Sequence, residues 1–424
     1  MKTQQVYSNG IYHGLPVHGD EHKDLTAVVT GANGISGQHL LRVLGQSPSR
    51  WSKIYSLSRR PPMGTELPAN VTHISVDFLS KPEDIAAVLR EAGVTKIDYV
   101  FFFSYIQVAP EPGKPLWSNA EAMCVKNTEL LANFLSALSV ASVIPRRVLL
   151  QTGAKNYGVH LGPAKVPQEE SDARVLIEPN FYYPQEDYLW DWCKRTGAGW
   201  NVARPGPVLG AVQDAAINLM FPLAVYAAVS KHLGQPLEFP GDLSAWEKLQ
   251  DQSSALLNGY LEEWAVLTPE AENQAFNATD GSHFTYGQFW PKLAAAFGID
   301  WKGPSLDPSQ YTVSKLSSET TPRGFGSQPE YRERFSIVGW AKRSDVQQAW
   351  REIASKHNLQ PQELTDIDRV FSVLEYTLNS AIFCNMSMDK ARRLGFFGTV
   401  NSCDSMLQVI QEYVDLKMMP PLQA

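Results

Sequence analysis

Three glycines at a regular spacing are the first residues of the chain that could hold a ligand. Gly31, Gly34 and Gly37 follow the apolar run LTAVVT and precede a stretch with leucines at helical spacing. Glycine lets a backbone turn sharply and approach a pyrophosphate, and the N-terminus of the following helix offers free N–H groups and a positive dipole end. Because the triplet stands between a strand and a helix, it predicts a dinucleotide site that also uses Asn33 and Ile35.

Two arginines end the next predicted strand, at the position that distinguishes the two nicotinamide dinucleotides. An Asp or Glu there would bind the ribose 2′-hydroxyl of NAD, whereas Ser58, Arg59 and Arg60 offer two guanidinium groups that can hold a 2′-phosphate. The sequence therefore favours NADPH over NADH. Asp77 and Phe78 end the third predicted strand, where a carboxylate and an apolar ring commonly border the adenine.

The glycine spacing resembles that of extended short-chain dehydrogenases/reductases, which normally use a Tyr-x-x-x-Lys pair. The phenol donates a proton to the substrate oxygen, and the lysine lowers the pKa of the phenol. Two segments fit the letters, Tyr311 with Lys315 and Tyr413 with Lys417. The working tyrosine should lie between the fifth and sixth strands, whereas these pairs fall in an irregular insert and on the terminal helix. We interpret both as chance matches.

Two other stretches stand between the fifth and sixth predicted strands: TGAKNY over 152–157 and NFYYPQED over 180–187. With them the chain resembles the progesterone 5β-reductase/iridoid synthase family, known for 1,4-reduction of enones with NADPH. The resemblance implies that Lys155 supplies the lysine and Tyr182 the phenol, with Tyr183 as the neighbouring alternative. A phenol beside the carbonyl oxygen would stabilise the negative charge of the enolate.

The resemblance covers most of residues 25–210 and, more loosely, the later segment AIFCNMSMDKARRLGF. It implies that Ser104 and Pro205 lie beside the cofactor. The chain departs from the plant enzymes in the longer segment after Lys155 and in the triplet FSY at 103–105. These residues would line the nicotinamide pocket, so the substrate need not be a steroid or a monoterpene dialdehyde. The pattern is closer to fungal members, several of which act in secondary metabolism.

Several alternatives stay open at this point. The same phenol could serve reduction of a ketone, and a scaffold of this kind could be an NADP-sensing regulator without turnover. An epimerase or dehydratase is less favoured because it usually keeps Tyr-x-x-x-Lys at the expected place. Glu186 and Asp187 are interpreted as first-turn residues of a helix, complementing its dipole. Composition alone suggests Met220, Phe221 and Trp290 as substrate contacts.

The elements that must position these residues alternate between strands and helices up to about residue 212. This alternation predicts an α/β fold, a Rossmann-type doubly wound parallel sheet, followed by a mostly helical substrate domain. We expect a solvated N-terminal arm over 1–24 that lies on a domain, an NADP-binding domain over 25–212 and a substrate domain over 213–424. One strand near 272–281 should return to the sheet, and residues 300–340 should form an irregular insert.

Composition excludes several functional classes. The chain has 424 residues with 37 Lys and Arg against 44 Asp and Glu, a net charge of −7, which argues against a nucleic-acid partner. Four scattered cysteines form no CxxC pair, so we expect neither a disulfide framework nor a metal site, and Cys124 and Cys193 should be buried. No apolar run is long enough for a membrane span, and no secretory signal is present. We expect a soluble cytoplasmic enzyme with a small-molecule substrate, which could pair as a homodimer.

Overall fold

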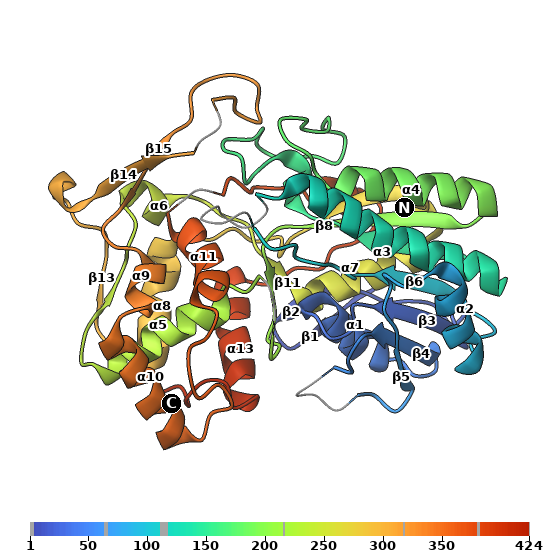
Figure 1. Cartoon of the computed structure of the whole chain (residues 1–424), viewed down its shortest axis with the longest axis horizontal. Coiled ribbons are helices and arrows are strands. Elements are labelled where there is room, and N and C mark those ends of the chain that lie inside the picture. Colours follow the sequence, from blue (N-terminus) through green and yellow to red (C-terminus); the bar gives the residue numbers. More distant parts are fainter. Residues whose placement is uncertain are drawn as a thin grey trace.

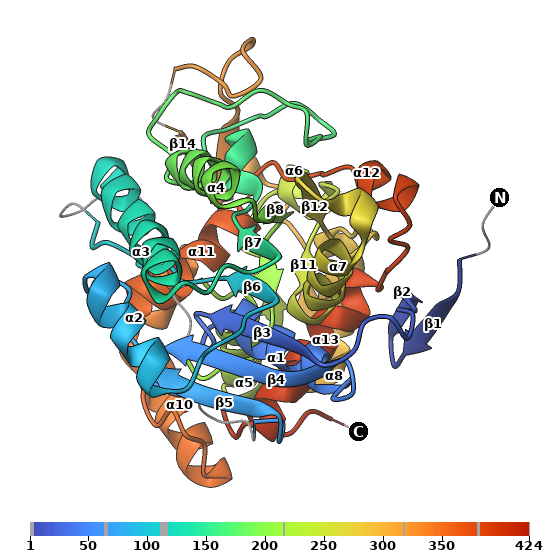
Figure 2. The same ribbon diagram turned by 90° about the vertical axis from the view of Figure 1, so that its right-hand side faces the viewer.

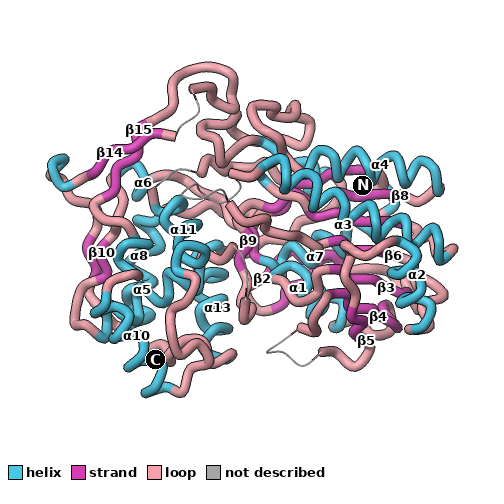
Figure 3. The backbone as a smooth tube through the Cα atoms, in the orientation of Figure 1, coloured by secondary structure: helices cyan, strands magenta, loops and turns pink. Residues whose placement is uncertain are grey.

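A computed structural model describes residues 4–62, 67–110, 118–214, 217–316, 319–379 and 382–423. The molecule has two halves that lie side by side (Figure 1). One half is a parallel sheet with helices on both faces, and the other is a bundle of helices (Figure 3). The sheet half contains the N-terminal part of the chain and also takes back later segments, namely a helix over 255–267, a strand over 274–278 and a short helix over 389–393.

The central sheet has seven strands in the order β5-β4-β3-β6-β7-β8-β12, and every neighbouring pair runs parallel. The strands are β3 (Leu25–Thr30), β4 (Trp51–Ser58), β5 (Val71–Ser75), β6 (Tyr99–Phe102), β7 (Arg147–Gln151), β8 (Gly199–Pro205) and β12 (Gln274–Ala278). The doubly wound sheet predicted from the sequence is confirmed. Strand order reverses between β3 and β6, and ligands of such sheets bind at the carboxyl ends beside this point.

Helices cover both faces of the sheet because its strands are apolar on both sides. Ala27 and Val29 of β3 pack into the core under one face, and Val28 packs into the core under the other. The helices of the first face are α1 (Ile35–Gly45) and α7 (Ala255–Leu267); those of the second are α2 (Pro82–Glu91), α3 (Ala120–Ala141) and α4 (Tyr182–Thr196). Figure 2 shows α2, α3 and α4 on the side of the sheet away from α7.

The second half of the molecule is a helical bundle with its own apolar core. Its helices are α5 (Met220–His232), α8 (Tyr286–Phe297), α9 (Ile337–Ala341), α10 (Ser344–His357), α11 (Ile367–Leu378) and α13 (Ser402–Asp415). Trp290 and Trp350 are fully buried there. No helix within the described ranges is long and apolar enough to cross a membrane.

The N-terminal segment forms a β-hairpin, which the sequence did not predict. Strands β1 (Val6–Asn9) and β2 (Tyr12–Pro16) pair antiparallel. Tyr12 and Leu15 are buried in the core beneath α7, and the Tyr12 hydroxyl lies 3.0 Å from Ser254 Oγ. The hairpin therefore lies on the domain with its inner side packed on α7, which removes both side chains from water.

The expected irregular insert contains short paired strands. Strand β13 (Trp301–Lys302) pairs with β10 (Leu237–Glu238), and β14 (Thr312–Lys315) pairs with β15 (Glu330–Glu333). The connection between β14 and β15 reaches the sheet half. There Arg323 N donates to the Pro163 carbonyl at 3.1 Å.

Candidate active site

A cavity of about 420 Å³ opens at the carboxyl ends of the central strands, where strand order reverses. Its walls come from the turn before α1, the ends of β6, β7 and β8, the start of α4, and the helical half. The cavity brings together nine of the residues predicted for cofactor binding and catalysis. These are Gly31, Asn33, Gly34, Ile35, Gly37, Ser104, Lys155, Tyr182 and Pro205.

The three glycines of the turn have different roles. Gly31 has φ +61°, and a Cβ there would lie 2.8 Å from the Phe103 carbonyl; a Cβ on Gly37 would lie 2.5 Å from the Gly31 oxygen. A Cβ on Gly34 would touch only the Gly31 oxygen, at 3.4 Å. Gly31 and Gly37 therefore permit close packing of the turn, whereas the space over Gly34 is open toward the cavity.

The start of α1 suits a pyrophosphate. The helix has no side-chain cap at Gly34 and no acidic residue in its first turn. Its first N–H groups are thus available to an anion, and no carboxylate competes with one. The residues present fit the dinucleotide that the sequence predicted.

The two arginines lie beyond this turn, after β4. Arg59 and Arg60 are exposed, and within the described ranges neither side chain forms an ion pair. The hydroxyls of Ser58 and Ser75 donate to the carbonyls of Arg60 and Arg59, at 2.6 and 3.0 Å. These bonds hold the backbone while both guanidinium groups stay in water, so they are available to a phosphate. The role of Ser58 is to hold the Arg60 carbonyl through its hydroxyl.

One predicted nucleotide contact does not fit the structure. Asp77 is exposed and lines a small hollow beside Arg59. Phe78, however, is buried, with its ring centroid 5.1 Å from that of Phe134 in the core of the sheet half. Its ring was expected to border the adenine, but the Phe78 side chain points inward, so only the backbone of this position could border a nucleotide.

Lys155 lies on a single 3₁₀ turn, η1 (Ala154–Tyr157), directly after β7. Its place on the cavity wall follows from the short connection between the strand and this turn. Burial lowers the pKa of Lys155 to about 8, against the opposite influence of the carboxylate of Glu178. The ammonium group is therefore still mostly charged at neutral pH.

Tyr182 is the first residue of α4 and lines the same cavity. Its hydroxyl would lie 3.0 Å from a Cβ on Gly153, so the missing side chain of that glycine makes room for the phenol. Burial, and then the nearby Tyr105, raise the pKa of Tyr182, and Lys155 is not among the groups that shift it. The phenol thus stays protonated at neutral pH and can donate a hydrogen bond.

Tyr183, the alternative phenol, points away from the cavity. Its hydroxyl donates to the Asn156 carbonyl at 2.7 Å and accepts from Val175 N at 2.8 Å. The ring is buried, and the Arg174 guanidinium lies 4.9 Å from its centroid. Tyr183 therefore joins the turn at Asn156 to the segment at Val175, and it does not face the space where a substrate would lie.

The interpretation of Glu186 and Asp187 as first-turn residues is wrong, because α4 begins at Tyr182 and they belong to its second turn. Glu186 is fully buried and pairs with Arg204 at 2.9 Å and with Arg174 at 3.3 Å. Asp187 pairs with Arg174 at 2.8 Å. This network fastens α4, and with it Tyr182, to the end of β8.

The helical half supplies a wall of the cavity that the sequence did not reveal. Met220 and Trp290 are buried in the core of that half, and Phe221 packs on Trp350 and Tyr413, so none of the three lines the cavity. The residues that do so are Asp214, Ile217, Val373, Thr377, Ile382 and Cys384. Only the looser resemblance around AIFC pointed to this region, because residues so distant in the chain meet only through tertiary packing.

The two Tyr-x-x-x-Lys segments lie outside the cavity. Tyr311 donates to the Ser305 carbonyl at 3.0 Å, and Lys315 pairs with Glu330 at 3.3 Å in the β14–β15 hairpin. Tyr413 is buried within the helical core, 3.3 Å from the Gly210 carbonyl. Neither tyrosine is placed to meet a nicotinamide bound over the glycine turn.

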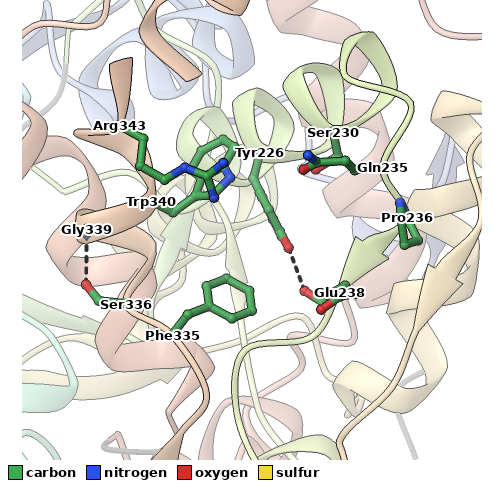
Figure 4. Close-up of a pocket in the computed structure, with 10 residues that line it drawn as sticks. All are labelled: Tyr226, Ser230, Gln235, Pro236, Glu238, Phe335, Ser336, Gly339, Trp340 and Arg343. Atoms are coloured by element: carbon green, nitrogen blue, oxygen red, sulfur yellow. Dashed lines mark hydrogen bonds between the residues drawn. The ribbon is translucent and has the colours of Figure 1, made fainter. Parts of the chain in front are cut away.

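A second cavity, of about 530 Å³, lies in the helical half (Figure 4). Tyr226, Phe335 and Trp340 form its wall, and the Tyr226 hydroxyl donates to the Glu238 carbonyl at 2.8 Å. It contains none of the residues predicted for cofactor binding or catalysis. The cavity at the carboxyl ends of the central strands is therefore the candidate active site.

Comparison with known proteins agrees with this geometry. Residues 27–313 match the family described as "PRISE-like Rossmann-fold domain". A 3-oxo-Delta(4,5)-steroid 5-beta-reductase of Arabidopsis thaliana is 30% identical over 404 residues, which cover 93% of each chain. An (S)-8-oxocitronellyl enol synthase of Catharanthus roseus is 29% identical over 93% of this chain and 92% of its own. The short chain dehydrogenase gsfE of Penicillium aethiopicum is 28% identical over 93% and 99%.

Solved structures support the fold. UDP-glucose 4-epimerase from Brucella ovis, in complex with NAD, is similar with a TM-score of 0.51 at 17% identity, over 66% of this chain and 86% of its own. The matched family spans more than half of the chain and includes the glycine turn, Lys155 and Tyr182. The chain therefore belongs to the PRISE-like family of extended short-chain dehydrogenases/reductases, which are oxidoreductases.

Proposed function

We propose that the protein reduces the C=C bond of a small enone with NADPH, using Tyr182 as hydrogen-bond donor. The observation that carries the proposal is the convergence of the glycine turn, Lys155 and the protonated phenol of Tyr182 on one cavity. The name of the Arabidopsis relative describes reduction of a 3-oxo steroid with a double bond at positions 4,5, which is a conjugated enone.

The chain's own residues account for the charge that develops in this reaction. When bound, NADPH supplies the hydride that adds to the β-carbon of the enone. Negative charge then appears on the carbonyl oxygen of the substrate, where the phenol of Tyr182 donates a hydrogen bond. A proton from solvent at the α-carbon completes the reduction. The Lys155 ammonium lies on the same wall, where it can hold the cofactor's ribose.

The choice of NADPH over NADH rests on Arg59 and Arg60. Their guanidinium groups are in water and within the described ranges have no carboxylate partner, so a 2′-phosphate would meet two uncommitted charges. We expect NADPH to bind at least about tenfold more tightly than NADH. The double substitution Arg59→Ala with Arg60→Ala should remove the preference. Equal affinities in the unmodified protein would contradict this assignment.

The reaction is tested by following NADPH oxidation with a panel of cyclic and acyclic enones and their saturated ketone counterparts. Product analysis should show the saturated ketone, with the carbonyl retained. An allylic alcohol as product would mean that the protein reduces the C=O bond of the enone. Oxidation of NADPH in the presence of the saturated ketones would likewise mean that it is a ketone reductase. Binding of NADPH without turnover of any substrate would favour a regulator.

A further inference from the structure

Asn180 connects the two segments that carry Lys155 and Tyr182. Its Nδ2 donates to the Lys155 carbonyl at 3.0 Å, and its Oδ1 accepts from Tyr182 N at 3.1 Å. The side chain is buried, and its residue is 25 positions away from Lys155 in sequence. No other orientation of the amide would satisfy both partners, because a carbonyl needs a donor and an N–H needs an acceptor.

The two hydrogen bonds make different demands on the residue at this position. The bond from Tyr182 N closes an Asx turn, which Asp forms as readily and Ser forms more weakly. The bond to the Lys155 carbonyl needs a donor at the end of a side chain of this length, which Asp and Ser lack. Asn is thus required only if the connection to Lys155 matters.

We infer that Asn180 is a positioning residue, which holds the Lys155 turn and the first turn of α4 in one arrangement within the active site. The inference rests on the proposed function for the roles of Lys155 and Tyr182. The 3₁₀ turn of Lys155 is short and is closed by two bonds of its own, from Asn156 N to the Gly153 carbonyl and from Gly158 N to the Lys155 carbonyl, both at 3.0 Å. A turn with so few internal bonds depends on outside contacts for its position. Two such contacts come from the start of α4 and the residues just before it: the Tyr183 hydroxyl bonds the Asn156 carbonyl at 2.7 Å, and the Asn180 amide is the one that bonds Lys155 itself.

The test uses the full chain with Asn180→Ser and Asn180→Asp. Both keep a side-chain acceptor for Tyr182 N, and both lose the donor to Lys155. We expect kcat for the best enone to fall about tenfold or more in each variant, since small displacements of catalytic groups cost this much. The KM for the enone should change by less than about threefold, and NADPH affinity should weaken by about threefold or more, because Lys155 faces the cofactor. Wild-type values of kcat and NADPH affinity in both variants would overturn the inference.

Asn201→Ser is the matched control. Asn201 is a fully buried asparagine whose Nδ2 also joins two segments, donating to the Ala271 carbonyl at 2.6 Å and to that of Gln274 at 3.2 Å, at the opposite end of β8. Its loss should lower the melting temperature with kcat and NADPH affinity unchanged.

The test also separates this inference from the proposed function. If the wild type turns over no enone, the proposed function fails, and NADPH affinity alone decides the role of Asn180. If NADPH affinity is then weaker in Asn180→Ser and unchanged in Asn201→Ser, the result supports the connection to Lys155. Equal losses in both variants would mean that Asn180 only stabilises the fold.

Discussion

Tyr182 and Tyr183 are adjacent in sequence, yet their hydroxyls meet different surroundings. The first faces the cavity, whereas the second is committed to the Asn156 carbonyl and Val175 N. A helix turns by about 100° per residue, so neighbouring side chains cannot share a face. Only the resemblance to a family, and not the letters FYY, could assign the phenol in advance.

Tyr182→Phe removes one hydrogen-bond donor and almost no volume. If this phenol stabilises charge on the substrate oxygen, kcat should fall ~10²–10³-fold, the effect of losing one oxyanion donor. NADPH affinity should stay nearly intact. Steady-state kinetics and cofactor titration on the same preparation measure both.

Tyr183→Phe provides the control for that substitution. It leaves the buried Asn156 carbonyl and the half-buried Val175 N–H without this partner, so the free energy of unfolding should drop by about 1–3 kcal/mol. Because the lost bond also holds the turn that carries Lys155, kcat should fall by about tenfold at most, far less than in Tyr182→Phe. A large loss of kcat in Tyr183→Phe, and none in Tyr182→Phe, would show that the phenol assigned here is wrong by one residue.

At the scale of elements, the strands of the sheet were predicted, whereas the N-terminal hairpin and the start of α4 were not. Continuous apolar runs such as LTAVVT mark strands covered on both faces, and all of them pair in the order expected of a doubly wound sheet. The hairpin β1–β2 was missed because β1 is exposed throughout and the buried residues of β2, Tyr12, Leu15 and Pro16, do not alternate regularly with exposed ones. The start of α4 was placed too late because aromatic residues fill its first turn.

The glycine turn before α1 yields a prediction that separates binding from folding. Gly34→Val adds atoms only into the open space toward the cavity, so the fold should survive while NADPH affinity falls below detection. Gly37→Val would instead drive its Cβ against the Gly31 oxygen, and the melting temperature should fall. Thermal denaturation and cofactor titration compare the two. A folded Gly34→Val variant with wild-type affinity would show that the turn has no role in binding.

Helix α7 contains a buried carboxyl that works against stability. Glu262 is buried, its side chain forms no hydrogen bond or ion pair within the described ranges, and burial raises its pKa well above the usual value. Glu262→Met should raise the free energy of unfolding by about 1–3 kcal/mol at pH 7.

The sign of the pH dependence follows from the raised pKa. The unfolded chain releases this proton above about pH 4.3 while the folded chain keeps it, so wild-type stability falls as pH rises through that range. The gain from Glu262→Met should therefore shrink as the pH falls toward 4, where the carboxyl is protonated in both states. Glu263→Met is the neighbouring control: Glu263 bonds Arg50 at 2.8 Å and Trp51 at 2.7 Å, and its loss should destabilise the protein. Equal effects of both substitutions would contradict the account.

At the scale of the whole molecule, the active site depends on contacts between distant parts of the chain. The loop that joins Lys155 to Tyr182 is held by the segment 382–387 of the C-terminal region, through the fully buried Gln168. Its Oε1 accepts from Asn385 N at 2.8 Å, and its Nε2 donates to the Phe383 carbonyl at 3.2 Å. No local pattern in the sequence signals such pairing, which is why the wall made by this segment was not predicted.

This arrangement predicts that Gln168 acts on the substrate side of the cavity and not on the cofactor side. Gln168→Ala leaves the Asn385 N–H and the Phe383 carbonyl unpaired, which frees the neighbouring wall residues Ile382 and Cys384. We expect the KM for an enone to rise about threefold to tenfold, with NADPH affinity unchanged, and the free energy of unfolding to fall by about 1–3 kcal/mol. Gln411→Ala, which removes an exposed bond to Asp415, should change none of these quantities. NADPH affinity should not change because the glycine turn and the arginines lie on the sheet half and do not touch Gln168. A loss of NADPH affinity with an unchanged KM would contradict this prediction and would mean that the segment 382–387 supports the cofactor.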